Sequence, residues 1–185
     1  MEGLRGASHA GQPSRSSGDA DAGGCRAAGT PGTSPGGSTP GKRILLVEDN
    51  PSDVALFLRA FGRGRVPHAV VVAADGQEAL DRLHGPETGP VSDPSEFPDL
   101  ILLDLKLPKV DGLEVLRRVR QNPRTRRIPV VILSSSTEYA DLSAGYDLGA
   151  NGYIRKPVSF DQFLSAVECL GHYWLGLNES PPRAV

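Results

Sequence analysis

The sequence of 185 residues has few cysteines and lacks any long hydrophobic run. Cys25 and Cys169 are too few to form a disulfide framework, which favours a reducing, cytoplasmic location. No run approaches the roughly 20 apolar residues that a membrane-spanning helix needs. The N-terminus also lacks the apolar core of a signal peptide. We therefore expect a cytoplasmic protein that does not associate with a membrane.

Neither sign of charge dominates, since the formal net charge is −2 at pH 7. This balance predicts no nucleic-acid partner. Six arginines lie between residues 117 and 127, but they fall on the outer face and the C-terminal turn of a predicted helix, where cations complement the helix dipole. We expect them to form a solvated face. The four histidines have no metal-ligand spacing.

Residues 1–41 differ in composition from the rest of the chain. They hold 11 of the 22 glycines and Leu4 as their only larger aliphatic residue. Such a segment cannot bury enough apolar surface to offset the entropy of ordering it. We predict a disordered tail over 1–41, a folded domain over 42–175 and a short C-terminal tail over 176–185. Within the domain, residues 85–98 form a long, proline-rich connection.

From Lys42 onward, apolar runs typical of buried strands alternate with helical patterns. The predicted strands cover residues 43–48, 68–73, 100–103, 130–133 and 152–155. The predicted helices follow Asn50 and Asp75, cover about 112–120 and 137–148, and begin at Ser159 and run toward Trp174. This alternation predicts an α/β fold with a five-stranded parallel sheet covered by five helices. Right-handed crossovers leave few strand orders.

Polar residues follow four of the apolar runs. Glu48 and Asp49 follow the first, Asp104 the third, Ser134 the fourth and Lys156 the fifth. In the order 2-1-3-4-5, ligands bind at the carboxyl edge between the first and third strands. Carboxylates on neighbouring strands about 4.8 Å apart repel one another unless a cation joins them. Mg²⁺ suits such a group, so the pattern predicts Mg²⁺-assisted phosphoryl transfer onto a carboxylate.

Four segments carry a resemblance to a known family. They are ILLVEDN at 44–50, LILLDLKLP at 100–108, VVILSSS at 130–136 and YIRKP at 153–157. In this order they closely resemble the receiver domain of bacterial response regulators, over about residues 42–175. The resemblance implies the flavodoxin-like, doubly wound fold with strand order 2-1-3-4-5.

The same resemblance implies a role for each residue at the site. Asp104 would accept a phosphoryl group from a sensor histidine kinase. Glu48, Asp49, Asp104 and the backbone carbonyl of Lys106 would hold Mg²⁺. The set that binds the phosphoryl group and switches conformation would be Ser134, Tyr153 and Lys156, and the Lys156–Pro157 peptide would be cis. The protein would catalyse only its own phosphorylation and dephosphorylation.

Only 28 residues follow Pro157, which predicts a receiver without an output domain. It would signal by a conformational change to a protein partner, or relay the phosphoryl group. The long connection over 85–98 and the aromatic ending at 172–175 resemble small regulators associated with bacterial phytochrome kinases. We also expect a homodimer through the face of the fourth helix, fifth strand and fifth helix.

Two other functional classes fit parts of the pattern. A phosphatase of the haloacid dehalogenase type also places a nucleophilic Asp after a buried strand, but it needs a second Asp two residues later, where this chain has Lys106. A pseudo-receiver that acts only as a binding module would lack an acid, the phosphoacceptor or the lysine. All of these residues are present.

Overall fold

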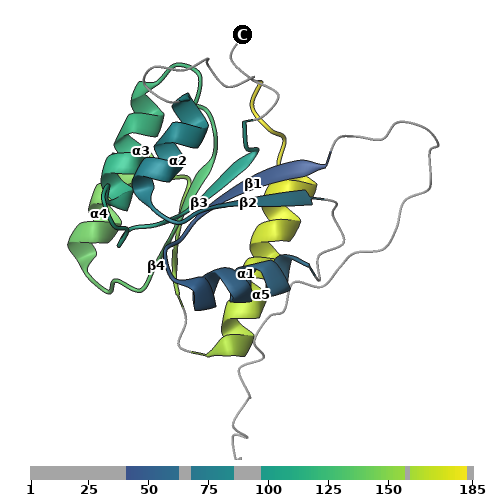
Figure 1. Ribbon diagram of the computed structural model, residues 1–185. Helices are drawn as coiled ribbons and strands as arrows, with labels where there is room; N and C mark the ends of the chain where they lie inside the picture. The colour runs from purple at the N-terminus through teal and green to yellow at the C-terminus, as the bar shows by residue number, and fades with distance from the viewer. Residues whose placement is uncertain (1–40, 63–67, 86–96, 157–158, 183–185) are drawn as a thin grey trace, which may run out of the picture. The chain divides into compact units, whose positions relative to one another are not determined.

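A computed structural model describes residues 41–62, 68–85, 97–156 and 159–182 of the chain (Figure 1). The described residues lie within one compact unit, Pro31–Val185. The predicted N-terminal tail over 1–41 therefore lies outside the described residues, apart from Gly41. The same holds for most of the 85–98 connection and for Pro157.

The described residues form five strands and five α-helices, as the sequence predicts. The strands are β1 (Lys42–Val47), β2 (His68–Ala73), β3 (Leu100–Asp104), β4 (Val130–Ser134) and β5 (Gly152–Arg155). The helices are α1 (Pro51–Phe61), α2 (Gly76–His84), α3 (Gly112–Gln121), α4 (Tyr139–Asp147) and α5 (Phe160–Gly171). A π-helical segment, His172–Leu177, continues α5.

The strands pair in parallel in the order β2-β1-β3-β4-β5, which confirms the predicted flavodoxin-like topology. Val47 pairs with Leu103, so the chain leaves β1 beside the end of β3. Asp104 pairs with Leu133, which brings Ser134 one residue further along the neighbouring strand. The register therefore gathers the polar residues at the ends of β1, β3 and β4 at one edge of the sheet.

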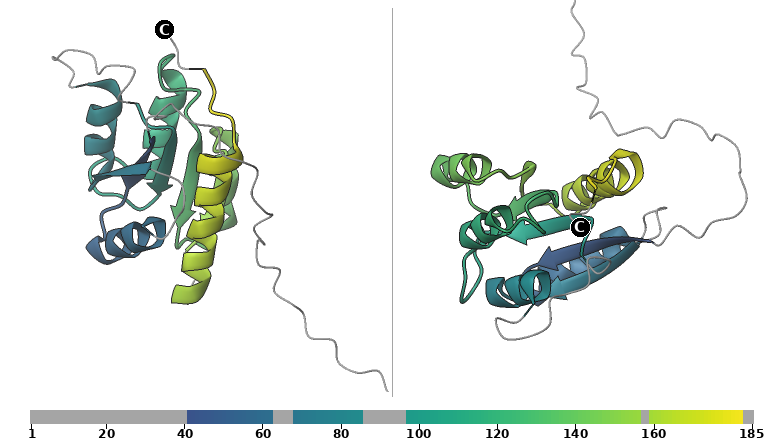
Figure 2. Two further views of the ribbon diagram at one scale, coloured as in Figure 1. Left: turned by 90° about the vertical axis from the view of Figure 1, so that its right-hand side faces the viewer. Right: turned by 90° about the horizontal axis from the view of Figure 1, so that it is seen from above.

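Helices cover both faces of the sheet, and each face has its own hydrophobic core. In Figure 2, α1 and α5 lie on one side, and α2, α3 and α4 on the other. Alternate residues of β1 point to opposite faces: Ile44 packs with the aromatic residues of α1 and α5, whereas Leu45 packs with α2 and α3. Phe57 is fully buried and meets Phe163 edge to face at 4.7 Å between ring centroids.

The helix starts follow the predicted capping chemistry. The Asn50 side chain accepts a hydrogen bond from the Ser52 backbone N–H at 2.9 Å. The Asp75 side chain accepts one from the Glu78 N–H at 2.8 Å. The predicted cap Ser159 accepts one from the Gln162 N–H at 3.3 Å. These bonds satisfy N–H groups that the first turn of a helix cannot pair internally.

The structure corrects two expectations. The last α-helix ends at Gly171 rather than near Trp174, because the chain continues as a π-helix. The six arginines between residues 117 and 127 do not all form a solvated face. Arg120 is half-buried and donates hydrogen bonds to the carbonyls of Gly149, Arg126 and Ile128 and to the side chain of Asn151. It therefore ties the α3–β4 loop to the chain before β5.

Among the residues that the structure describes, no helix is long and apolar enough to cross a membrane.

Candidate functional site

The carboxyl edge of the sheet brings three acidic side chains together. Glu48 follows β1 and keeps 2% of its surface exposed, and Asp104 ends β3 with 7% exposed. Asp49 is exposed to solvent. Each of the three offers a carboxylate oxygen, and these oxygens all lie within 4.8 Å of one another. Three negative charges at this separation repel strongly unless a cation lies between them.

The chemistry of this group fits a hard divalent cation. Its ligands are all oxygens, and one of the three carboxylates is open to solvent, so a bound ion could keep several waters. Lys106, whose backbone carbonyl is the fourth predicted ligand, lies exposed in the loop after β3, two residues beyond Asp104.

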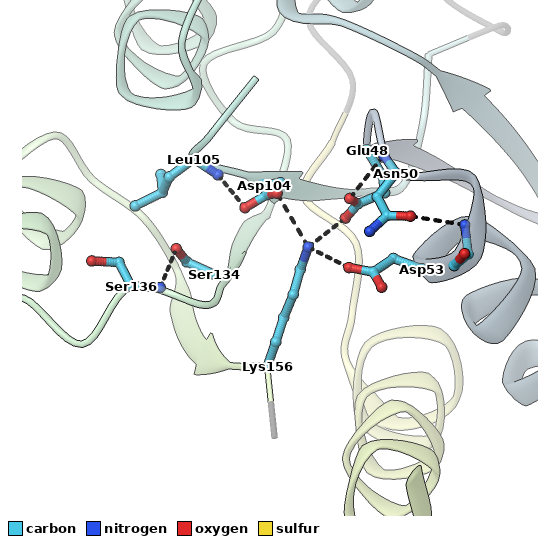
Figure 3. Close-up of polar contacts among 9 residues, drawn as sticks. Glu48, Asn50, Asp53, Asp104, Leu105, Ser134, Ser136 and Lys156 are labelled. Carbon is cyan, nitrogen blue, oxygen red and sulfur yellow. Dashed lines mark hydrogen bonds and ion pairs between the residues drawn. The ribbon is translucent and has the colours of Figure 1, made fainter. Parts of the chain in front are cut away.

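Lys156 carries the compensating positive charge. Its Nζ donates hydrogen bonds to Glu48 at 2.7 Å, to Asp53 at 2.9 Å and to Asp104 at 3.1 Å (Figure 3). Burial disfavours the charged ammonium, but the bonds to Glu48 and Asp53 outweigh it and raise the Lys156 pKa. The ammonium is thus retained at every physiological pH.

Burial has a different effect on Glu48. Loss of water around its carboxylate raises the Glu48 pKa, although the hydrogen bond from Lys156 acts in the opposite direction. The nearby charge of Asp104 adds to the increase. A cation bound beside these carboxylates would favour the ionised form of Glu48.

Backbone contacts fix the orientation of Asp104. Its Oδ1 accepts a hydrogen bond from the Leu105 N–H at 2.7 Å, and its Oδ2 faces Lys156. Gly112, the first residue of α3, packs directly on this backbone. A Cβ at Gly112 would overlap the Asp104 carbonyl oxygen and lie 2.7 Å from the Leu105 Cα. The start of α3 therefore helps to hold the Asp104 carboxylate in place.

Ser134 ends β4, and Tyr153 lies on β5, the strand that leads to Lys156. Ser134 is fully buried, and its Oγ accepts a hydrogen bond from the Ser136 N–H at 3.1 Å. The Lys156 N–H donates to the Ser134 carbonyl at 2.9 Å, which joins the ends of the two strands. Tyr153 packs against the core formed with α2 and α3, and its hydroxyl is buried without a hydrogen-bond partner among the described residues.

The structure thus brings Glu48, Asp49, Asp104 and Lys156 together as predicted, with Ser134 at the adjacent strand end. The predicted cis peptide at Lys156–Pro157 involves Pro157 and lies outside the described residues. Sequence reasoning missed Asp53. It lies in the first turn of α1, where an acid ordinarily stabilises the helix, so no separate pattern in the sequence indicates its contact with Lys156.

Comparison with known proteins points to one family. Residues 44–168, more than half of the chain, match the family described as "Response regulator receiver domain". The chain is 45% identical over 141 residues to the probable methanogenesis regulatory protein FilR2 of Methanothrix harundinacea, a match that covers 76% of this chain and 88% of FilR2. It is 38% identical over 138 residues to the response regulator Rcp1 of Synechocystis, covering 75% of this chain and 92% of Rcp1.

Solved structures agree with these matches. The phosphorylated cyanobacterial phytochrome response regulator RcpA superposes with a TM-score of 0.70 at 42% identity, over 77% of this chain and 99% of RcpA. The Mn²⁺-bound form of Rcp1 superposes with a TM-score of 0.68 at 36% identity, over 76% of this chain and 99% of Rcp1. A similar protein therefore holds a divalent cation, the class of ion that the acidic group here fits.

Proposed function

This chain belongs to the response regulator receiver family, whose members accept a phosphoryl group in two-component signalling, and we propose that Asp104 is its acceptor. The protein is a signalling phosphoacceptor whose partner is a histidine kinase, and not a catalytic enzyme. The observation that carries the assignment is the position of Asp104. Its carboxylate belongs to the group of three acids whose oxygens lie within 4.8 Å of one another, and it also accepts a hydrogen bond from the Lys156 ammonium at 3.1 Å.

The predicted ligands of Mg²⁺ are Glu48, Asp49, Asp104 and the backbone carbonyl of Lys106. When bound, Mg²⁺ would supply positive charge to the oxygens of the incoming phosphoryl group. The Lys156 ammonium lies 3.1 Å from Asp104, and it would neutralise further charge on those oxygens.

Ser134 and Tyr153 are proposed to convert phosphorylation into a conformational change. The Ser134 hydroxyl at the end of β4 would donate a hydrogen bond to the new phosphoryl group. Its present partner, the Ser136 N–H, belongs to the segment that leads into α4. Tyr153 would change its packing, which is feasible because its hydroxyl has no hydrogen-bond partner to give up among the described residues. The phosphoryl group thereby favours one state of the β4–α4 segment.

Intact-mass spectrometry tests the acceptor. The protein incubated with acetyl phosphate and Mg²⁺ should gain one phosphoryl group, and Asp104→Asn should gain none. Asp111→Asn is a matched control, because this exposed side chain caps α3 and Asn is an equally good cap. Undiminished labelling of Asp104→Asn would show that another residue is the acceptor.

We further propose that the kinase is of the phytochrome type. This rests on the similarity to RcpA, which is a phytochrome response regulator. A phosphotransfer profile against the histidine kinases of the host tests it: the phytochrome kinase should transfer its phosphoryl group faster than the others. Faster transfer from a kinase without a phytochrome module would contradict the proposal. We expect this exchange in the cytoplasm, in keeping with the low cysteine content.

The homodimer expected through α4, β5 and α5 is likewise a proposal. Its support is the pair Tyr139 and Tyr146 on α4, which are 79% and 52% exposed and lie seven residues apart, on one side of the helix. At the C-terminal end, Tyr173 and Leu177 are exposed, whereas Leu175 is buried in the core.

Light scattering with and without beryllofluoride, a phosphoryl mimic, tests the dimer. The wild type should dimerise more strongly with the mimic, and a Tyr139→Ser, Tyr146→Ser double variant should stay monomeric. Leu58→Ser, an exposed site on α1, is the control for loss of surface apolar area. A wild type that is monomeric in both states at high concentration would remove the dimer. The output would then be contact with another protein or relay of the phosphoryl group.

A further inference from the structure

Asp53 is a fourth acid beside the Lys156 ammonium, and no role has been given to it so far. Its Oδ2 accepts a hydrogen bond from Lys156 Nζ at 2.9 Å, a length between the 2.7 Å bond of Glu48 and the 3.1 Å bond of Asp104 to the same atom (Figure 3). Its side chain is 27% exposed, whereas those of Glu48 and Asp104 are 1% and 9% exposed. Asp53 therefore approaches the ammonium from the solvent side.

The first turn of α1 holds Asp53 firmly. Asn50 caps the helix through its bond from the Ser52 N–H. Phe57 lies one turn after Asp53 on the same side of the helix, and it is fully buried against Phe163. Because α1 is anchored at its cap and by this aromatic contact, the Asp53 carboxylate is a fixed partner for Lys156.

The two buried carboxylates that pair with Lys156 are also needed for a metal. Glu48 and Asp104 both belong to the group of acids that fits a divalent cation. An ammonium and a divalent cation that share the same carboxylates repel each other and compete for the oxygens. Asp53 is not a member of that group, so its carboxylate stays available to Lys156 when the other two are engaged by metal.

We propose that Asp53 is a positioning residue that holds the Lys156 ammonium beside Asp104 while Glu48 and Asp104 bind the metal. This rests on the proposed function of Asp104 and Lys156. Without Asp53, the ammonium depends on Glu48 and Asp104 alone. It then competes more strongly with Mg²⁺, and it moves away from Asp104 when Mg²⁺ is bound.

A merely structural role for Asp53 predicts a different pattern. An acid in the first turn of a helix favours the helix through the dipole, whatever residue is present at position 156. The proposed role, by contrast, exists only while Lys156 is present. A double-mutant cycle between the two positions therefore separates the two roles.

The experiment is a Mg²⁺ titration in which NMR signals of the backbone amides report binding. It is carried out on the wild type, Asp53→Asn, Lys156→Ala and the double variant. Asp53→Asn should weaken Mg²⁺ binding several-fold in the wild-type background. In the Lys156→Ala background it should change binding less than about twofold, because only a screened, partly exposed charge is lost. Asp161→Asn, an exposed acid in the first turn of α5, is the matched control and should leave Mg²⁺ binding unchanged.

The rate of labelling by phosphoramidate at saturating Mg²⁺ is the second measurement. Asp53→Asn should slow it about tenfold, the effect expected when one charge-assisted hydrogen bond no longer positions a catalytic cation. Asp53→Glu should restore part of the rate. An equal effect of Asp53→Asn on Mg²⁺ affinity in both backgrounds, or no effect in either, would overturn the proposal. The double-mutant cycle measures Mg²⁺ affinity, which does not depend on which residue accepts the phosphoryl group. Labelling of Asp104→Asn would therefore refute the proposed function separately.

Discussion

Replacing Lys156 with alanine removes the ammonium that three carboxylates share. In the metal-free protein this leaves the Glu48, Asp49 and Asp104 carboxylates close to one another and Asp53 without its cationic partner, with Glu48 and Asp104 almost wholly buried. We expect the variant to fold but to be markedly less stable than the wild type in EDTA. We also expect Mg²⁺ to restore a large part of the loss, because it places positive charge among the same oxygens.

The size of the effect follows from the burial of the site. Removing one partner of a buried ion pair costs about 3–5 kcal/mol. We take about 3 kcal/mol, since Asp49 and Asp53 retain contact with water and can be partly screened. For a domain of this size, a loss of about 3 kcal/mol lowers the Tm by roughly 10 °C.

The stabilisation by Mg²⁺ gives a second free-energy difference that can be measured independently. At a Mg²⁺ concentration of about ten times the wild-type Kd, binding stabilises the wild type by about 1.4 kcal/mol. Lys156→Ala no longer has an ammonium that competes for Glu48 and Asp104. If its Mg²⁺ affinity is about tenfold higher, the same concentration stabilises it by about 2.7 kcal/mol. Mg²⁺ should thus narrow the difference between the two proteins by about 1.3 kcal/mol.

Urea unfolding at pH 7.5, in EDTA and at this Mg²⁺ concentration, measures both effects. Lys109→Ala is the control, because it removes a lysine whose side chain is 66% exposed and which pairs with Asp75. That surface pair should contribute less than about 1 kcal/mol, with no dependence on Mg²⁺. The reasoning is refuted if Lys156→Ala is as stable as the wild type in EDTA, or if Mg²⁺ stabilises both by the same amount.

Three further predictions concern the metal, the pH and the packing of the site. Asp49→Ala should weaken Mg²⁺ binding about tenfold or more in a titration, because it removes one of the proposed charged ligands; equal affinities would place the metal elsewhere. Burial lowers the pKa of His84 from its usual 6.5, with a smaller effect from Arg118. As the pH falls, His84 is therefore protonated in the unfolded chain before it is protonated in the folded protein, so the free energy of unfolding should fall as the pH drops below 6.5. Urea unfolding at pH 5.5 and 7.5 measures this decrease, which should be smaller in His84→Leu. Gly112→Ala should cost about 2 kcal/mol in urea unfolding, because its Cβ overlaps the backbone at Asp104; it should also slow labelling by acetyl phosphate.

The fold was predictable because its signals are local and repeated. Runs such as Ile44–Val47 and Leu100–Leu103 are apolar throughout, which is typical of strands buried on both faces. Parallel strands end at the same edge of a sheet, so the residues after each run had to converge. Glu48, Asp104 and Ser134 could be placed at one site by this geometry, before any contact between them was known.

The residues that sequence reasoning misplaced have side chains that contact other segments of the chain than their own helix. Arg120 lies in the last turn of α3, where a cation normally remains in solvent, yet it bonds to three carbonyls. The direction of a long side chain depends on what the neighbouring loops offer, and no local pattern encodes that. The π-helix after Gly171 likewise depends on a contact outside its own element. Its only buried residue is Leu175, which packs into the core shared by α1 and α5.

Asp53 shows why the site itself was only partly predictable. Its spacing from Asn50 explains it fully as a helix-stabilising acid, and that explanation is also correct in the structure. The contact of Asp53 with Lys156 arises because α1 starts three residues after Glu48, at the same edge of the sheet where Lys156 follows β5. A strand-end residue is placed by the sheet alone, whereas a helix residue reaches the site only if the loop length and helix direction also agree. Acids in the first turn of a helix that follows the first strand of such a sheet are therefore candidates for contact with its lysine, and the distance from Asp53 to Lys156 identifies this one.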